Sequence, residues 1–202
     1  MIRVYGDIML DRWVLGNTSR ISPEAPVPIL VEQEQKYSIG GAGNLALNIQ
    51  SINGDVSLYG NVGQDKEGFK LLELLGSTQL NINLSSDRGI TTTKTRLVGQ
   101  YGQHIVRWDR EEVYKGKDAF DRLIASIEPL DIVCISDYNK GTVQEDTVQK
   151  IVDKTTRVLV DPKQHYKFYK GALLVKPNMK EYNDWNGTFN PETALEFMKE
   201  ND

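Results

Sequence analysis

The stretch DIVCISD, at residues 131–137, places four consecutive apolar residues between two aspartates. We interpret residues 131–135 as a strand, because a short apolar run of this kind is typical of a strand buried on both faces of a parallel sheet. The elements predicted around it are helices at 117–127 and 144–154 and strands at 157–160 and 172–175. This alternation predicts an α/β fold with a mostly parallel central sheet covered by helices on both faces.

The N-terminal half continues this pattern and adds further strands. Its predicted elements are strands at 2–7 and 56–60 and helices at 45–52 and 64–75. Residues 91–98 and 104–109 are rich in Thr, Val and Ile but also carry charges, which is typical of a hairpin with one face in water. A short strand at 27–32 follows the proline-rich stretch 22–28. We interpret the hairpin as an excursion from the parallel sheet.

Composition narrows the class of protein. The 202 residues include 24 Lys and Arg against 28 Asp and Glu, a net charge of −4 that argues against nucleic acid as the main partner. No apolar run approaches the roughly 18 residues that a membrane span needs. A single cysteine excludes an internal disulfide, and we expect a cytoplasmic protein.

Polar side chains follow the predicted strands at their carboxyl ends, where open α/β sheets bind ligands. A set of carboxylates, amides and lysines there suits a ligand with hydroxyls and phosphates. Each residue alone has another interpretation, since Asn178 or Asp137 could simply cap a helix. The set comprises Asp7, Asp11, Asp137, Asn139, Lys140, Asp161, Lys163, Lys176, Asn178 and Glu181.

The stretch GGAGN, at residues 40–44, precedes the predicted helix 45–52. Glycines let backbone amides approach an anion or hydroxyl closely, although a plain tight turn is the alternative. Residues 41–46 also match the dinucleotide pattern G-x-G-x-x-A. We reject that interpretation because polar residues 33–38 separate the glycines from the preceding strand, and no acid ends the next one.

The stretch GDIMLDRW at residues 6–13 and the run SRISPEAPVP at 19–28 resemble the PfkB (ribokinase) family of carbohydrate kinases. Within it, they are most similar to the heptose-7-phosphate kinase domains of bifunctional ADP-heptose synthases. The resemblance continues through residues 40–44, 93–96, 107–109, 136–141, 160–163 and 176–181.

The resemblance implies a ribokinase-like three-layer sandwich with a small β-sheet lid. It implies one incomplete domain over 1–202, with lid strands at about 27–36 and 91–110. The implied reaction is ATP- and Mg²⁺-dependent phosphorylation of D-glycero-β-D-manno-heptose 7-phosphate to the 1,7-bisphosphate, a step toward ADP-heptose and the lipopolysaccharide core. The implied partners are the sugar phosphate, ATP, and either a second copy docked through the lid or a partner that supplies the missing C-terminal part.

The resemblance also implies roles for individual residues. The sugar phosphate would be held by Asp7, Asp11, Arg20, Gly40, Gly41, Asn44, Lys94, Arg96, Arg107, Asp137 and Lys140. The nucleotide phosphates would be held by Lys163, Lys176, Asn178 and Glu181, with Glu181 also reaching Mg²⁺ through water.

One family motif is absent from the sequence. In the family, a G-A-G-D motif supplies an anion hole and the aspartate that deprotonates the attacking hydroxyl, and these 202 residues contain no such motif. We therefore assign no catalytic base and expect the C-terminal part of the fold to be missing. Two hypotheses stay open: a kinase completed by another segment or polypeptide, and a non-catalytic sugar-phosphate-binding module. We also expect exposed apolar surface, and self-association or partner binding, where further strands would pair.

Overall fold

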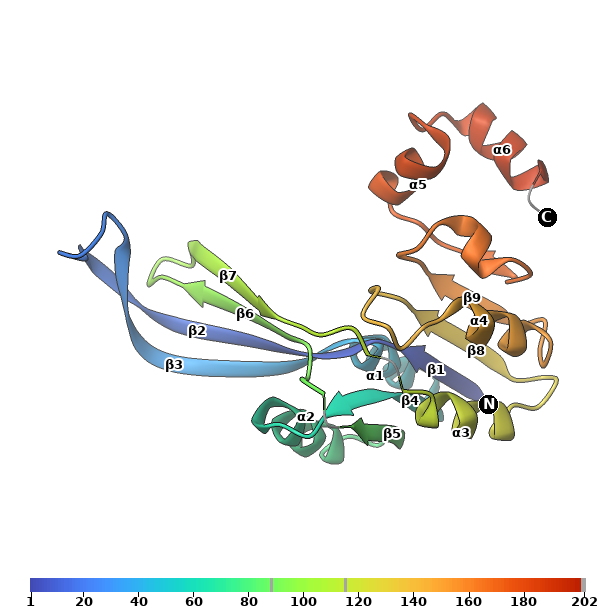
Figure 1. Cartoon of the computed structure of the whole chain (residues 1–202), viewed down its shortest axis with the longest axis horizontal. Helices are drawn as coiled ribbons and strands as arrows, with labels where there is room; N and C mark the ends of the chain where they lie inside the picture. Colours follow the sequence, from blue (N-terminus) through green and yellow to red (C-terminus); the bar gives the residue numbers. More distant parts are fainter. Residues whose placement is uncertain (88, 115, 201–202) are drawn as a thin grey trace.

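Six parallel strands form the central sheet of the computed structural model, which describes residues 1–87, 89–114 and 116–200 (Figure 1). The strand order is β10-β9-β8-β1-β4-β5, and every neighbouring pair is parallel. The strands are β1 (Ile2–Gly6), β4 (Val56–Gly63), β5 (Asn81–Asp87), β8 (Ile132–Ser136), β9 (Val158–Asp161) and β10 (Leu174–Val175). The predicted parallel sheet is therefore confirmed, and β5 is an additional strand that we did not predict.

Helices cover both faces of this sheet because apolar side chains alternate along its strands. Val4, Leu58 and Cys134 face one side and pack in one core cluster with α1 (Ala42–Asn53) and α2 (Lys66–Gly76). Tyr5 and Ile135 face the other side, against α3 (Asp118–Ser126) and α4 (Glu145–Val152). The three layers match the predicted architecture. The chain continues through a 3₁₀ turn η1 (Tyr166–Tyr169) to α5 (Met179–Asn186) and α6 (Pro191–Glu200).

A second, four-stranded sheet projects away from the first (Figure 1). Its order is β3-β2-β6-β7, with β2 and β6 parallel and the outer pairs antiparallel. The register places Asp11 beside Lys94 and Trp13 beside Arg96, so these side chains share one face. Arg12 and Trp108 lie on the opposite face. The strands are β2 (Ile8–Ile21), β3 (Pro28–Gly41), β6 (Thr93–Val98) and β7 (His104–Arg110).

The second sheet is larger than the sequence pattern indicated. Strand β2 was not predicted, and β3 is a 14-residue strand that includes the polar residues 33–38. Those residues pair with β2 at a surface open to water, so apolar alternation was no guide to them. Our statement that no strand runs directly into Gly40 and Gly41 was therefore wrong. The dinucleotide interpretation still fails, because β3 pairs antiparallel with β2 and is not part of the parallel sheet.

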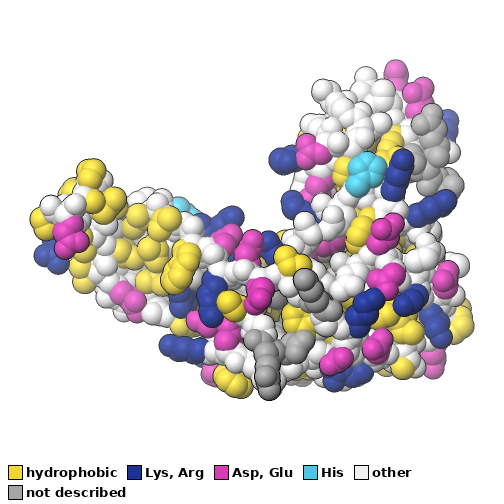
Figure 2. All heavy atoms as spheres, viewed as in Figure 1, with side chains coloured by type: hydrophobic (Ala, Val, Ile, Leu, Met, Phe, Trp, Pro, Cys, Tyr) yellow, Lys and Arg dark blue, Asp and Glu magenta, His cyan; other side chains and the backbone are white. Residues whose placement is uncertain are grey.

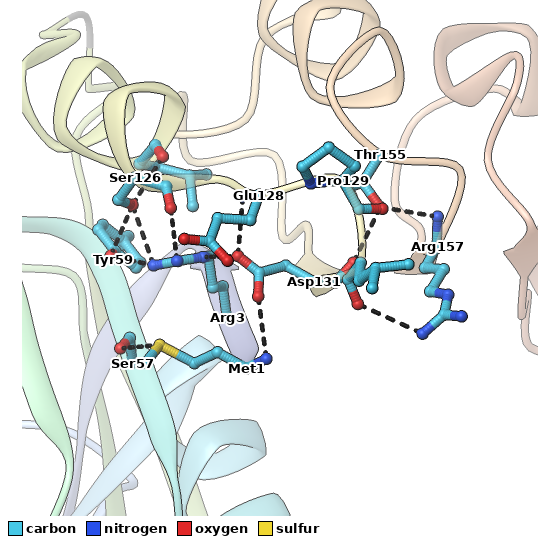
Figure 3. A network of polar contacts seen from close by, with 12 residues as sticks. Met1, Arg3, Ser57, Tyr59, Ser126, Glu128, Pro129, Asp131, Thr155 and Arg157 are labelled. Carbon is cyan, nitrogen blue, oxygen red and sulfur yellow. Dashed lines mark hydrogen bonds and ion pairs between the residues drawn. The ribbon is translucent and has the colours of Figure 1, made fainter.

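A buried charge network fastens the amino end of the central sheet (Figure 3). Asp131 accepts from Arg3 Nε at 2.7 Å and pairs with the Met1 ammonium at 2.9 Å. Arg3 also donates to the Tyr59 hydroxyl at 2.9 Å and to Ser126 Oγ at 3.0 Å. Burial raises the pKa of Asp131, but the Glu128 N–H, the Met1 ammonium and Arg3 outweigh it and lower that pKa to about 2.

Apolar side chains are exposed at the β10 edge of the central sheet. Leu173 and Leu174 are 66% and 53% exposed. A hollow of about 220 Å³ lies beside them, lined by Ile132, Arg157, Leu159 and Leu173. The sheet thus has the exposed apolar edge that we expected, with a strand of only two residues as its border.

The network in Figure 3 predicts a strong effect of Asp131→Asn. The change leaves Arg3 buried without its counter-charge, and we expect a loss of about 3 kcal/mol in the free energy of unfolding. Urea unfolding followed by circular dichroism measures it. The matched control is Asp146→Asn, which breaks an exposed ion pair to Lys117 and is expected to cost less than about 1 kcal/mol. Equal losses in the two variants would contradict the assignment.

Candidate functional site

The candidate site lies where the carboxyl ends of the central strands meet the second sheet. Figure 2 shows the molecule deeply notched between the second sheet and the segment that carries α5 and α6. Loops after β1, β8, β9 and β10 open toward this side of the sheet because all six strands are parallel.

Asp7 holds the loop after β8 in place. It is 1% exposed and separates β1 from β2. Its carboxylate accepts backbone N–H groups from Tyr138 at 2.8 Å, Lys140 at 3.1 Å and Thr142 at 3.1 Å. Both carboxylate oxygens accept hydrogen bonds from the protein, and Asp7 thereby positions the loop 137–142.

The two glycines predicted to line the sugar site lie against two aspartates. A Cβ at Gly40 would come within 2.5 Å of Asp11 Oδ2, so the absence of a side chain leaves room for that carboxylate. Gly41 has φ +59° and packs directly on the Asp7 carbonyl, which accepts the Ala42 N–H at 2.9 Å. Asn44 is exposed on the first turn of α1.

One face of the second sheet carries a cluster of cations around Asp11. Arg96 donates to Asp11 Oδ1 at 2.6 Å and stacks on the Trp13 ring at 4.9 Å. Lys94 lies 5.0 Å above the Tyr138 ring, so β6 contacts the loop that Asp7 holds. Burial lowers the pKa of Lys94, against the opposing effect of the nearby Asp11 and Asp109 carboxylates.

Two further predicted cations lie at the margin of this cluster. Arg107 pairs with its own neighbour on the sheet face, Asp109, at 3.0 Å, and its side chain is 60% exposed. Lys140 pairs with Glu111 at 2.7 Å, which joins the loop after β8 to the segment that follows β7.

Asp137 is buried and hydrogen-bonded on both oxygens. It accepts the Tyr169 hydroxyl at 2.6 Å and the Asn139 N–H at 2.6 Å. Burial raises the pKa of Asp137 to about 6, although both hydrogen bonds and Lys163 act in the opposite direction. The Tyr169 hydroxyl in turn accepts the backbone N–H groups of Lys163 at 2.9 Å and Gln164 at 2.8 Å. Asp137 thus connects the loops after β8 and β9.

The predicted nucleotide side gathers at the ends of β9 and β10. Glu181 and Asn178 form a reciprocal cap on α5, with both side-chain to backbone distances at 2.9 Å. Lys163 lies 3.3 Å from Glu181 Oε1, and Lys176 lies 3.2 Å from Asp161. The Asn178 side chain therefore caps α5, as the capping interpretation predicted.

Glu181 and Asp161 suit a magnesium ion bound through water better than one that they ligate directly. Glu181 Oε2 is occupied by the Asn178 N–H and Oε1 faces Lys163. Among the residues that the structure describes, no group of three or more His, Cys, Asp and Glu side chains could hold a metal. Mg²⁺ usually keeps several waters and binds one or two carboxylates plus substrate phosphates. Glu181 and Asp161 could meet such an ion through water, beside the phosphates of a nucleotide.

The structure does not bring Arg20 together with the other predicted residues. Arg20 is exposed, pairs with Ile29 and lies nine positions beyond Asp11 on the same strand, which corresponds to about 30 Å. Within this chain, Arg20 therefore cannot share a ligand with Asp11.

Sequence reasoning missed several residues that build the site. Tyr169, Tyr138 and Asp65 were not among the predicted site residues. Asp65 caps α2 and contacts the second sheet. The glycines that flank Asp65, at 63 and 68, were the available signal.

Comparison with known proteins identifies the class. The model for "pfkB family carbohydrate kinase" matches residues 1–201. The chain belongs to the PfkB family of carbohydrate kinases. It is 38% identical over 203 residues to the bifunctional protein HldE of Haemophilus influenzae (strain PittEE), covering 96% of this chain and 42% of that protein. It is 39% identical to the HldE of Coxiella burnetii (strain RSA 331 / Henzerling II), covering 97% and 42%. The chain thus spans about two fifths of these relatives.

Solved structures establish the ribokinase-like fold. Phosphofructokinase-2 from Escherichia coli in complex with fructose-6-phosphate superposes with a TM-score of 0.75 at 20% identity, covering 99% of this chain and 69% of that one. A carbohydrate kinase from Agrobacterium tumefaciens gives a TM-score of 0.70 at 16% identity, covering 97% of this chain and 66% of that one.

Within the described residues, no helix is long and apolar enough to cross a membrane.

Loss of the hydrogen bond from Tyr169 is predicted to shift the pKa of Asp137. Tyr169→Phe removes the hydroxyl that stabilises the ionised carboxylate, so we expect the pKa of Asp137 to rise above about 6. Carboxyl carbon chemical shifts followed by NMR across pH 4–9 measure it. Tyr166→Phe, in the same 3₁₀ turn, is the control and should leave that titration unchanged. A lower pKa in Tyr169→Phe would contradict the assignment.

Proposed function

We propose that this chain binds the sugar substrate of an ATP-dependent heptose 7-phosphate kinase. The reaction is phosphorylation of D-glycero-β-D-manno-heptose 7-phosphate to the 1,7-bisphosphate. The observation that carries the proposal is the cluster of Asp11, Arg96 and Lys94 on one face of the second sheet, beside Tyr138. A carboxylate for hydroxyls and adjacent cations for a phosphate suit a phosphorylated sugar. The similarity to HldE proteins supports the heptose as the substrate.

The chain's own residues divide into two groups in this proposal. Asp11 accepts hydrogen bonds from sugar hydroxyls, while Lys94, Arg96 and the more exposed Arg107 pair with the sugar's phosphate. Gly40, Gly41, Asn44 and Lys140 border the sugar in this proposal. Lys163 and Lys176 would pair with the nucleotide phosphates, and Asn178 positions Glu181, which would hold Mg²⁺ through water. The bound Mg²⁺ would neutralise phosphate charge during transfer.

No described residue is assigned as the catalytic base. Asp137 has a raised pKa, but both of its oxygens are engaged by Tyr169 and Asn139. This observation favours a second candidate function, a non-catalytic sugar-phosphate-binding module. The two differ in one measurement, the formation of heptose 1,7-bisphosphate by this chain with Mg-ATP, followed by mass spectrometry. Product at an enzymatic rate supports the kinase, and binding without product supports the module.

The sugar site is tested by isothermal titration with D-glycero-β-D-manno-heptose 7-phosphate. Lys94→Gln should weaken binding by about 1–3 kcal/mol, because it removes a charge-assisted contact to the phosphate. Arg12→Gln is the matched control, since Arg12 lies on the opposite face of the neighbouring strand, above Trp108. Equal weakening by both variants, or no binding by the unmodified chain, would reject the site.

We also propose that two copies associate through the second sheet. Val31, Val106 and Trp108 are 50%, 48% and 58% exposed there, and Figure 2 shows apolar side chains gathered over this sheet. Contiguous exposed apolar surface of this kind marks association sites. Sedimentation velocity should give a dimer that Trp108→Glu dissociates, whereas Leu173→Glu at the β10 edge should leave it intact. A monomeric unmodified chain would contradict the proposal.

A further inference from the structure

Besides the direct connection from β1 through Asp7 to β2, a second joint between the two sheets is organised around one carboxylate, that of Asp65. Asp65 caps the N-terminus of α2 by accepting the Gly68 N–H at 2.8 Å. It also accepts the Thr91 N–H at 3.2 Å and the Thr91 hydroxyl at 2.7 Å. Arg110 donates to it at 3.1 Å and to Glu67 at 2.8 Å. Asp65 therefore contacts the central domain and the second sheet at once.

These partners lie at the two ends of the β6–β7 hairpin of the second sheet. Thr91 comes two residues before β6 begins at Thr93, and Arg110 is the last residue of β7. Strands β6 and β7 carry Lys94, Arg96 and Arg107, the cations proposed to meet the sugar's phosphate. A change in the joint would therefore move all three cations together relative to the loop 137–142.

Two glycines make the close approach possible. A Cβ at Gly68 would lie 2.7 Å from Thr91 Oγ1, and one at Gly63 would lie 2.6 Å from the Thr91 nitrogen. The Gly63 N–H also donates to the Thr91 hydroxyl at 3.0 Å. Thr91 is 2% exposed. Residues 63–68 thus pack closely around Thr91 and hydrogen-bond to it. This contact explains the G-x-D-x-x-G pattern of residues 63–68.

We propose that Asp65 and Arg110 are positioning residues that set the angle of the second sheet over the sugar site. The inference rests on the proposed function for its ligand. Arg110 itself cannot bind a sugar that lies on the face of Lys94 and Asp109. It pairs with Thr93 in the sheet, and both residues lie on the opposite face. Its effect on binding passes through the orientation of β6 and β7.

The joint is held by more than one ion pair, because its charged residues share partners. A single exposed ion pair contributes little to stability. Here the Asp65 and Glu67 side chains are only 17% and 19% exposed, and both face the same guanidinium. Asp65 is further fixed by three hydrogen bonds from Gly68 and Thr91. Removing the guanidinium leaves the cap of α2 in place and removes the contact of the end of β7 with Asp65 and Glu67.

The angle of the second sheet is tested by measuring the distance between two spin labels. Spin labels at Ser19→Cys, near the far end of β2, and Ser51→Cys, on α1, are both at exposed positions, while Cys134 is buried. Pulsed electron resonance without ligand should give a narrow distance distribution that Arg110→Gln broadens. Lys66→Gln, the same charge change on an exposed residue of α2, should leave it narrow. An unchanged width in Arg110→Gln would overturn the proposal.

A binding measurement connects the angle to the ligand. Arg110→Gln should weaken the affinity for D-glycero-β-D-manno-heptose 7-phosphate about two- to tenfold, and Arg110→Lys should restore part of it. Asp65→Asn combined with Arg110→Gln should weaken binding by less than the sum of the two single losses, because the variants share the contact between Asp65 and Arg110. Additive losses would overturn the proposal. If the unmodified chain fails to bind this sugar phosphate, the proposed function fails, while the ligand-free distances still decide whether the joint sets the angle.

Discussion

The capture of three backbone N–H groups by the buried carboxylate of Asp7 is the contact on which the site depends. It fixes the loop after β8 against the end of β1, and that loop presents Tyr138 to Lys94 and Lys140 to Glu111. Leaving those N–H groups or that charge unpaired inside the protein would be costly, so the loop has little freedom to move. The site is therefore preorganised from its buried side.

The site itself is divided between two sheets of different character. The parallel sheet offers loop ends and the N-terminus of α5, which favour anions, whereas the second sheet offers long side chains on one polar face. Neither part encloses a ligand alone. On the face of the second sheet that carries Asp11 and Lys94, Arg96 neutralises the Asp11 carboxylate. In the proposed function, sugar hydroxyls and a phosphate would compete for these two groups.

Much of this organisation was predictable from the sequence, for identifiable reasons. The buried parallel strands were found because continuous apolar runs such as 132–135 have few other uses, and strand ends located Asp137 and Lys163. Strand β2 was missed although Ile8, Met9 and Leu10 are buried, because the rest of the strand shows no apolar period. The sequence pattern predicted β3 only as 27–32, because residues 33–36 are polar and exposed. The roles of Asp7, Tyr169 and Asp65 depend on partners up to 135 residues away in the chain, which no local pattern reveals. Arg20 was grouped with the site by motif alone, although strand length separates it from Asp11.

A single residue separates β1 from β2, and this has a mechanical consequence. Asp7 joins the strand at the centre of the parallel sheet to the longest strand pair of the second sheet, and its carboxylate holds the loop 137–142. From that loop, Asp137 reaches Tyr169, whose hydroxyl holds the backbone of Lys163. A continuous path of covalent bonds and hydrogen bonds thus connects the second sheet to the opposite side of the notch.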